Sequence, residues 1–282
     1  MLGEAAEAYR VRLGERLVAA YALGSLAHGG FSELVSDIDL GLIVSDPLQP
    51  ADAETIKAVA DIEKSKGTAL HGRLSVFWGT PSTLRGEREG GRFPALDRLD
   101  LIENGRVLTG SDDARRSLPR PTAKELLITG AEFALDYLAG VSRPAGLPTE
   151  GLGSMRLAAE DAVEEILTPD LLLGRGVRRV TKLVLFPVRF VYTAATGRVG
   201  TNTAAVARYL EVHHAPSTRL VAAALAWRTA PPADQQAASR LLGEQMVPLY
   251  LYYIDDHIAR LGSIGEVDLA RAFQEWRDRL VR

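Results

Sequence analysis

Hydrophobic and polar positions follow two different patterns along the chain, and the first pattern occupies residues 1–118. Two short apolar runs, Leu17–Leu23 and Ile38–Val44, have the length and composition of buried strands. Helical spacing of apolar residues over 51–66 predicts a helix after the second run, and residues 73–78 could form a third strand. This order of elements predicts a small domain of α/β (α+β) type with a mixed sheet.

The second pattern begins after a polar segment that ends in Pro119 and Pro121. Long stretches rich in Ala and Leu then follow at helical spacing, and short segments rich in Gly or Pro separate them. This pattern predicts an all-α helical bundle. We therefore expect two domains, at residues 1–118 and 119–282.

Composition narrows the function classes. The chain of 282 residues has no cysteine, which excludes disulfide scaffolds, cysteine zinc sites and thiol nucleophiles. Its net charge of −3 gives no sign of a nucleic-acid coat, so nucleic acid is not an expected partner. No apolar run reaches the ~18 residues that a membrane span needs, and the N-terminal residues carry no signal-peptide core. We expect a cytoplasmic protein without a membrane partner.

Two acids interrupt the second apolar run. Asp37 and Asp39 are two residues apart, so in a strand their side chains share one face, while Ile38 and Leu40 point into a core. Two carboxylates beside apolar surface would have one pKa raised unless a cation neutralises them. Magnesium fits, because it takes one or two protein carboxylates and completes its shell with water and phosphate oxygens. Asp37 and Asp39 are therefore the predicted metal ligands.

A Gly-Ser pair lies upstream of the two acids. Gly24 ends the first strand candidate and Ser25 opens a predicted helix, a place that offers backbone N–H groups and a hydroxyl to phosphate. Gly24 also lets a phosphate approach the backbone closely. The two acids alone would be common as exposed residues at the end of a strand, and the Gly-Ser pair alone would be common as a turn. Together, with eleven residues between them, they predict a site for magnesium and a triphosphate.

The pattern Gly24-Ser25-(x11)-Asp37-Ile38-Asp39 resembles the signature of the DNA polymerase β-like nucleotidyltransferase superfamily. The surrounding stretch, YALGSLAHGGFSELVSDIDLGLIV, is closest in pattern to bacterial aminoglycoside (streptomycin/spectinomycin) adenylyltransferases. In the second half, residues 185–211 are similar to the arginine-containing helix of that family and the Y-x-x-x-T-G turn after it. The resemblance thus covers the first domain and much of the second.

This resemblance implies a magnesium-dependent transfer of a nucleoside monophosphate, AMP from ATP, to a hydroxyl of a small molecule, with an aminoglycoside as the leading acceptor. Asp37 and Asp39 would hold two magnesium ions, and Ser25 would contact the β and γ phosphates. Arg189 matches a phosphate-contacting arginine, and Tyr253 falls near a tyrosine that contacts the nucleotide. A surface salt bridge and a packed aromatic side chain explain these last two residues equally well. The active site would lie in the cleft between the domains.

Two positions depart from the family. The resemblance implies a third carboxylate on the following strand, where Ser75 stands, and serine is neither an anionic metal ligand nor a general base near neutral pH. Asn202 stands where relatives have a phosphate-binding lysine. Three interpretations remain open: Asp97, Asp100 or Glu103 substitutes for the acid; the protein binds nucleotide without efficient turnover, as a regulatory protein could; or a charged acceptor needs no base.

A further alternative lies in the second half. Arg208 and His213 have the spacing Arg-x4-His, which resembles the motif of helical HEPN RNases found beside small nucleotidyltransferases in toxin–antitoxin systems. The arginine would stabilise a phosphate and the histidine would move a proton. Cationic side chains that complement the dipole at a helix C-terminus explain the same residues without catalysis.

Overall fold

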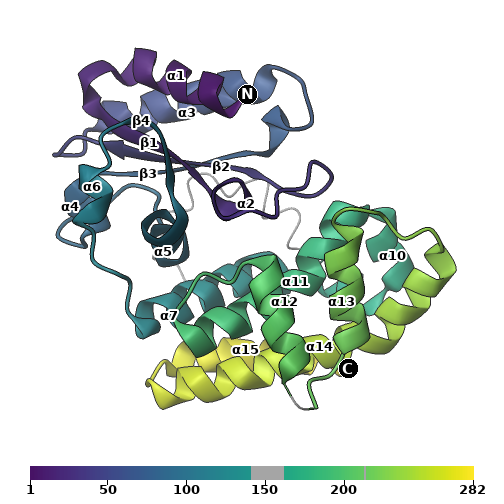
Figure 1. Cartoon of the computed structure of the whole chain (residues 1–282). Helices are drawn as coiled ribbons and strands as arrows, with labels where there is room; N and C mark the ends of the chain where they lie inside the picture. The colour runs from purple at the N-terminus through teal and green to yellow at the C-terminus, as the bar shows by residue number, and fades with distance from the viewer. Residues whose placement is uncertain (141–161, 213) are drawn as a thin grey trace. The chain divides into compact units, whose positions relative to one another are not determined.

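The computed structural model describes residues 1–140, 162–212 and 214–282. The chain forms two compact units, Met1–Pro121 and Thr122–Arg282, which we call the N-terminal unit and the helical unit (Figure 1). The N-terminal unit contains a four-stranded mixed sheet with helices, and the described part of the helical unit is built from helices. The expected fold class is confirmed.

The sheet of the N-terminal unit has the strand order β3-β2-β1-β4. Its strands are β1 (Leu17–Leu23), β2 (Ile38–Val44), β3 (Leu74–Gly79) and β4 (Arg106–Gly110). β2 and β3 run parallel, whereas β1 is antiparallel to both of its neighbours. The two apolar runs of the sequence are the two central strands, which are buried on both faces and therefore carry a continuous apolar signal.

The edge strand β4 was not predicted. Val107 and Leu108 are 41% and 37% exposed, so this strand lacks the buried apolar run that marks β1 and β2. The sequence there shows only a helical pattern followed by an Asn104-Gly105 turn. Pairing with β1 makes these residues a strand, and that pairing is a tertiary interaction with no local signal.

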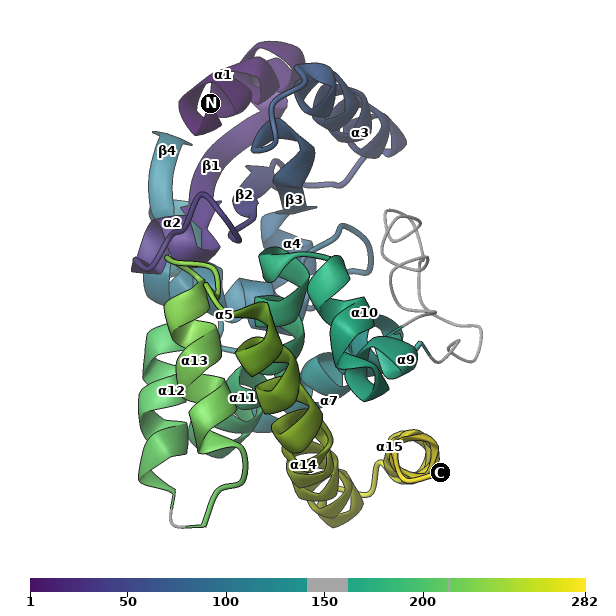
Figure 2. The same ribbon diagram turned by 90° about the vertical axis from the view of Figure 1, so that its right-hand side faces the viewer.

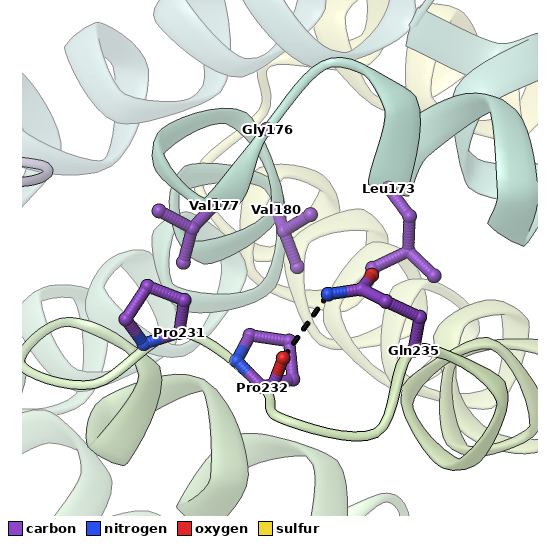
Figure 3. A pocket seen from close by; sticks show the side chains of 7 residues that line it. All are labelled: Leu173, Gly176, Val177, Val180, Pro231, Pro232 and Gln235. Carbon is purple, nitrogen blue, oxygen red and sulfur yellow. Dashed lines mark hydrogen bonds between the residues drawn. The ribbon is translucent and has the colours of Figure 1, made fainter.

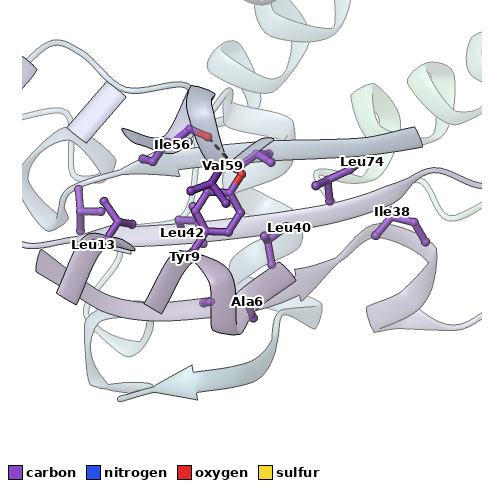
Figure 4. Close-up of a cluster of buried hydrophobic side chains, with 12 residues drawn as sticks. Ala6, Tyr9, Leu13, Ile38, Leu40, Leu42, Ile56, Val59 and Leu74 are labelled. Atoms are coloured by element: carbon purple, nitrogen blue, oxygen red, sulfur yellow. Dashed lines mark hydrogen bonds between the residues drawn. The ribbon is translucent and has the colours of Figure 1, made fainter. Parts of the chain in front are cut away.

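One face of the sheet is covered by α1 (Leu2–Leu13) and α3 (Pro50–Ser65). These two helices lie together on the same side of the sheet in both ribbon views (Figures 1 and 2). Alternate residues of β2 point toward them and join the core cluster drawn in Figure 4, together with Tyr9 of α1 and Val59 of α3. α3 also makes the crossover that a parallel β2–β3 pair requires.

The opposite face of the sheet packs against α5 (Ala95–Asn104) and the short α4 (Pro81–Leu84). Its core cluster consists of Ala19, Tyr21, Leu23, Ile43, Leu84, Leu101 and Leu118. The remaining short helices of this unit are η1 (Gly14–Arg16), α2 (Gly24–His28), η2 (His71–Arg73) and α6 (Asp113–Arg116). Because odd-numbered positions of β2 point to this second face, any chemistry at Asp39 belongs to the side of α5.

The helical unit begins at α7, whose first turn is closed by a capping box between Thr122 and Glu125. Its elements are α7 (Ala123–Ala134), the π-helical η3 (Leu135–Ala139), α9 (Ala162–Leu167), α10 (Pro169–Gly174), α11 (Val177–Thr196), α12 (Asn202–Glu211), α13 (Thr218–Trp227), α14 (Gln235–Ser263) and α15 (Val267–Leu280). Among the residues that the structure describes, no helix has both the length and the apolarity of a membrane span.

A proline lies in the middle of α11. Pro187 has no N–H, so the carbonyl of Leu183, four residues earlier, loses its helical hydrogen bond. The hydroxyl of Tyr250 on α14 donates to this carbonyl at 2.8 Å, and Tyr250 is fully buried. A donor from the neighbouring helix α14 thus replaces the N–H that Pro187 lacks, and α11 continues through the proline.

Candidate functional site

The two predicted metal ligands lie at the start of β2. Asp39 is the second residue of the strand, and Asp37 directly precedes it. Ile38 and Leu40 are buried in the cluster under α1 and α3, as the alternation predicts, and the two aspartates are half-buried. Asp39 therefore lies on the sheet face of α5, beside Leu23, its register partner on β1.

Gly24 lies directly against the Asp39 carboxylate. It follows β1 with φ of +59°, a backbone conformation that favours glycine. A Cβ atom built on Gly24 would overlap Oδ2 of Asp39 and would lie 3.1 Å from its Cγ. In this structure the missing side chain of Gly24 makes room for a carboxylate of the chain itself. Ser25 follows in the first turn of α2 and is half-buried.

The Gly24 backbone is also bound from α5. Its N–H donates to Oδ2 of Asp100 at 2.5 Å. Asp100 is 7% exposed, and its other oxygen accepts a hydrogen bond from Nδ2 of Asn104 at 2.8 Å. The sequence marked Asp100 only as one of three substitutes for a missing acid, because 76 residues separate it from Gly24 and no local pattern connects the two.

Ser75 stands next to Asp39 on the neighbouring strand. The parallel register of β2 and β3 pairs Asp39 with Ser75, so both side chains emerge on the same face. This is the position at which the resemblance implies a third acid. Across the described residues, no three or more His, Cys, Asp or Glu side chains gather into a group that could hold a metal ion. The predicted donor set is two carboxylates, which fits magnesium only when phosphate and water complete its shell.

The three acids considered as substitutes for Ser75 have different surroundings. Glu103 forms an ion pair with Arg120 at 2.5 Å. Asp97 is half-buried near the start of α5. Asp100 reaches the Gly24 turn, where its carboxylate accepts a hydrogen bond from the backbone N–H of Gly24.

Arg189 lies on α11 of the helical unit, where it contacts Gly200 and Phe186. Its Nε donates to the carbonyl of Gly200 at 2.5 Å, and its guanidinium lies 5.6 Å from the centre of the Phe186 ring. Arg228 lies near Arg189, at the C-terminal end of α13. Its burial, and after that the positive charge of Arg189, lower the pKa of the Arg228 guanidinium. Two arginines thus contribute positive charge to one region of this unit, and Asn202 begins α12 directly after Gly200 and Thr201.

Tyr253 lies in the core of the helical unit. It is 0% exposed, and its ring centre is 4.3 Å from that of His257 and 5.8 Å from that of Phe273. Burial raises the pKa of its hydroxyl well above the ordinary value. These surroundings are those of a packed aromatic residue, and packing alone accounts for its position. The nucleotide contact expected for Tyr253 stays a prediction.

The Arg-x4-His motif lies only partly within the described residues. Arg208 is exposed near the end of α12, and His213 lies outside the described residues, so the Arg-x4-His motif cannot be assembled here.

A pocket of about 180 Å³ lies in the helical unit (Figure 3). It is lined by Leu173, Gly176, Val177, Val180, Pro231, Pro232 and Gln235. No ionisable side chain lines it, so it offers nothing to a phosphate or a metal.

Comparison with known proteins adds one finding. No protein-family model matches the chain, and no curated protein matches it in sequence. Among solved structures, the chain is similar to spectinomycin adenyltransferase AAD(9) from Enterococcus faecialis, whose crystal structure contains ATP and spectinomycin. The similarity covers 100% of this chain and 98% of that chain, with a TM-score of 0.53 and 12% sequence identity. The chain therefore shares the overall fold of that adenyltransferase.

At 12% sequence identity this similarity shows the fold alone. The Gly24 turn and the Asp39 carboxylate are in contact. Ser75 occupies the neighbouring strand position. The N-terminal unit therefore brings Gly24, Asp39 and Ser75 together, and the metal ligands predicted from the sequence stay a prediction.

Proposed function

We propose that this chain is a magnesium-dependent nucleotidyltransferase that moves a nucleoside monophosphate, AMP from ATP, to a hydroxyl group of a small molecule. The observation that supports this most is the Asp39 carboxylate resting on the Gly24 turn, one residue from Ile38 in the core and two from Asp37. That geometry is built into a nucleotidyltransferase-like fold over the whole chain.

Each residue has a role in the proposed reaction. Asp37 and Asp39 would hold magnesium through their carboxylate oxygens, and bound magnesium supplies charge neutralisation at the phosphates. The Ser25 hydroxyl would donate to the β or γ phosphate, and Arg189 would contribute positive charge to the same triphosphate. A bond forms between the acceptor oxygen and the α phosphorus, the bond from that phosphorus to the β-phosphate oxygen breaks, and pyrophosphate leaves.

The acceptor is proposed by similarity alone. AAD(9) was crystallised with spectinomycin, so a hydroxyl of an aminoglycoside or of a related aminocyclitol is the first acceptor class to test. Ser75 cannot take the proton of that hydroxyl near neutral pH. Transfer therefore requires another proton acceptor, which could be solvent or a group on the acceptor itself.

Calorimetric titration with ATP and magnesium tests the nucleotide site. We expect wild-type protein to bind, and the double variant Asp37→Ala/Asp39→Ala to bind about 100-fold more weakly or not at all, because both metal ligands are lost. A matched control removes two exposed acids from α3, Glu54→Ala/Asp61→Ala, and should bind like wild type. Equal binding by wild type and the Asp37/Asp39 variant would overturn the proposal.

A second assay tests transfer. Pyrophosphate release is measured with ATP, magnesium and a panel of acceptors that includes spectinomycin and streptomycin, and mass spectrometry then looks for an acceptor that has gained AMP. Release that depends on one acceptor and disappears in the Asp37/Asp39 variant supports the enzyme.

A second candidate function is nucleotide binding without turnover, as in a regulatory protein. The register that sets Ser75 opposite Asp39 favours it, because that strand position carries no acid. Binding of ATP and magnesium without pyrophosphate release from any acceptor would select this candidate over the enzyme.

A further inference from the structure

Asp100 is a buried acid whose position the proposed reaction does not explain. It lies on α5, is 7% exposed, and uses both carboxylate oxygens on neighbours in its own unit. One oxygen accepts from the N–H of Gly24 at 2.5 Å, and the other from Nδ2 of Asn104 at 2.8 Å. Burying a carboxylate costs free energy unless hydrogen bonds compensate, and these two hydrogen bonds supply that compensation.

The contact leads directly to the metal ligand. Gly24 is held at φ of +59°, and the space where its side chain would be is filled by the Asp39 carboxylate. A hydrogen bond from a peptide N–H to a carboxylate is among the stronger ones and fixes the orientation of that peptide. The Asn104 contact in turn fixes the rotamer of Asp100. Asn104, Asp100, Gly24 and Asp39 thus form a continuous series of contacts from α5 to β2.

We propose that Asp100 is a positioning residue: it locks the Gly24 turn and thereby holds the Asp39 carboxylate in the orientation that binds magnesium and nucleotide. This role rests on the proposed function of Asp39. It differs from the hypothesis that Asp100 replaces the missing acid at Ser75, because a positioning residue needs only a hydrogen-bond acceptor, whereas a metal ligand or base needs a negative charge.

The same contact limits where phosphate can bind. The N–H of Gly24 is already used by Asp100, so a triphosphate would have to be bound by Ser25 and the residues after it. In this proposal Gly24 makes room for Asp39, whereas the sequence suggested that Gly24 lets a phosphate approach the backbone closely.

Two substitutions separate charge from hydrogen bonding. Asp100→Asn keeps a carbonyl oxygen for the Gly24 N–H, and its amide can face Asn104 after that side chain flips. Asp100→Ala removes the acceptor. We expect Asp100→Ala to weaken binding of Mn²⁺ with ATP by about tenfold, the scale of outer-shell partners of metal sites, and Asp100→Asn to stay within about threefold of wild type. Asp61→Asn on α3 is the charge-matched control.

Amide hydrogen exchange of Gly24, followed by NMR in the protein without ligand, gives a readout that does not depend on activity. The Gly24 amide should be protected in wild type and in Asp100→Asn and should exchange faster in Asp100→Ala. Mn²⁺ binding is measured at a temperature below the thermal unfolding transition of each variant. Should Asp100→Ala not fold, Asn104→Ala takes its place, with a smaller loss of Gly24 protection and of Mn²⁺ affinity expected.

The outcomes distinguish the two proposals. Loss of Mn²⁺ and ATP binding in Asp100→Asn, with the Gly24 amide still protected, would make Asp100 a metal ligand or base and overturn the positioning role. An unprotected Gly24 amide in wild type would overturn it as well, as would unchanged binding in Asp100→Ala. Failure of wild type to bind Mn²⁺ and ATP would instead overturn the proposed function, and the role of Asp100 with it.

Discussion

At the scale of single residues, the candidate site is defined by what stands beside Asp39. Gly24 has no side chain there, Ser75 has an uncharged one, and Asp100 reaches the same turn from α5. The alternation of β2 made the orientation of Asp39 predictable, since Ile38 and Leu40 had to be buried. The contribution of Asp100 was not predictable, because contacts between distant positions leave no trace in local spacing.

Ser75 allows a direct test of whether the site has lost an acid. We expect Ser75→Asp to raise the affinity for magnesium with ATP by about tenfold, because a third carboxylate then lies beside Asp39. The same variant should be less stable without metal, since neighbouring carboxylates repel each other. Calorimetry and thermal unfolding measure both effects.

The control for this substitution is Ser75→Asn, which has nearly the same size as aspartate without its charge. It should neither gain metal affinity nor show metal-dependent stability. If Ser75→Asp and Ser75→Asn behave alike, the position does not face the metal, and the interpretation of Ser75 as a lost ligand is wrong.

At the scale of elements, α11 and α14 are joined by a hydrogen bond that Pro187 makes necessary. The Tyr250 hydroxyl donates to the Leu183 carbonyl, which cannot accept the usual helical hydrogen bond from residue 187 because that residue is proline. Burial raises the pKa of this hydroxyl well above its ordinary value, so near neutral pH it is protonated and can donate. A helix pair that looks independent in sequence is therefore coupled through one carbonyl.

A double-mutant cycle measures this coupling. Tyr250→Phe should destabilise the protein by about 1–3 kcal/mol, because it leaves a buried carbonyl without a hydrogen bond. In the background of Pro187→Ala, the new N–H of residue 187 can bond to Leu183, so the same Tyr250→Phe change should cost at least about 0.5 kcal/mol less. Urea denaturation of the four proteins gives the four free energies of unfolding. Equal costs in both backgrounds would contradict the coupling.

At the scale of the whole molecule, the sequence predicted two kinds of architecture and the structure has both. The apolar runs marked β1 and β2, because central strands are buried on both faces, and they left β4 unmarked, because its side chains are largely exposed. The helical unit was recognisable from periodicity, but the burial of Tyr253 was not, since a core tyrosine and a ligand-contacting tyrosine have the same local pattern.

The proposed function also assigns a role to the helical unit, through Arg189. We expect Arg189→Ala to weaken ATP binding about tenfold, or about 1.4 kcal/mol, through loss of a charged contact to phosphate. Arg189→Lys should recover part of the loss, because it keeps the charge without the planar donor fork. Calorimetry at constant ionic strength measures each variant.

Arg198, which is exposed just beyond α11, provides the matched control. Arg198→Ala removes one positive charge from the same unit and should bind ATP like wild type. An equal loss in both variants would point to a general effect of net charge. No loss in Arg189→Ala would leave the arginine with its observed role of holding Gly200 and stacking on Phe186.

The overlap that a side chain at position 24 would make with Asp39 has a consequence for surveys of related genomes. A side chain at position 24 would force the Asp39 carboxylate to move, so we expect the two positions to vary together, with glycine at 24 wherever aspartate stands at 39. Alanine or serine at position 24 should therefore occur mainly in sequences that lack the aspartate, and translated reads alone are enough to check this.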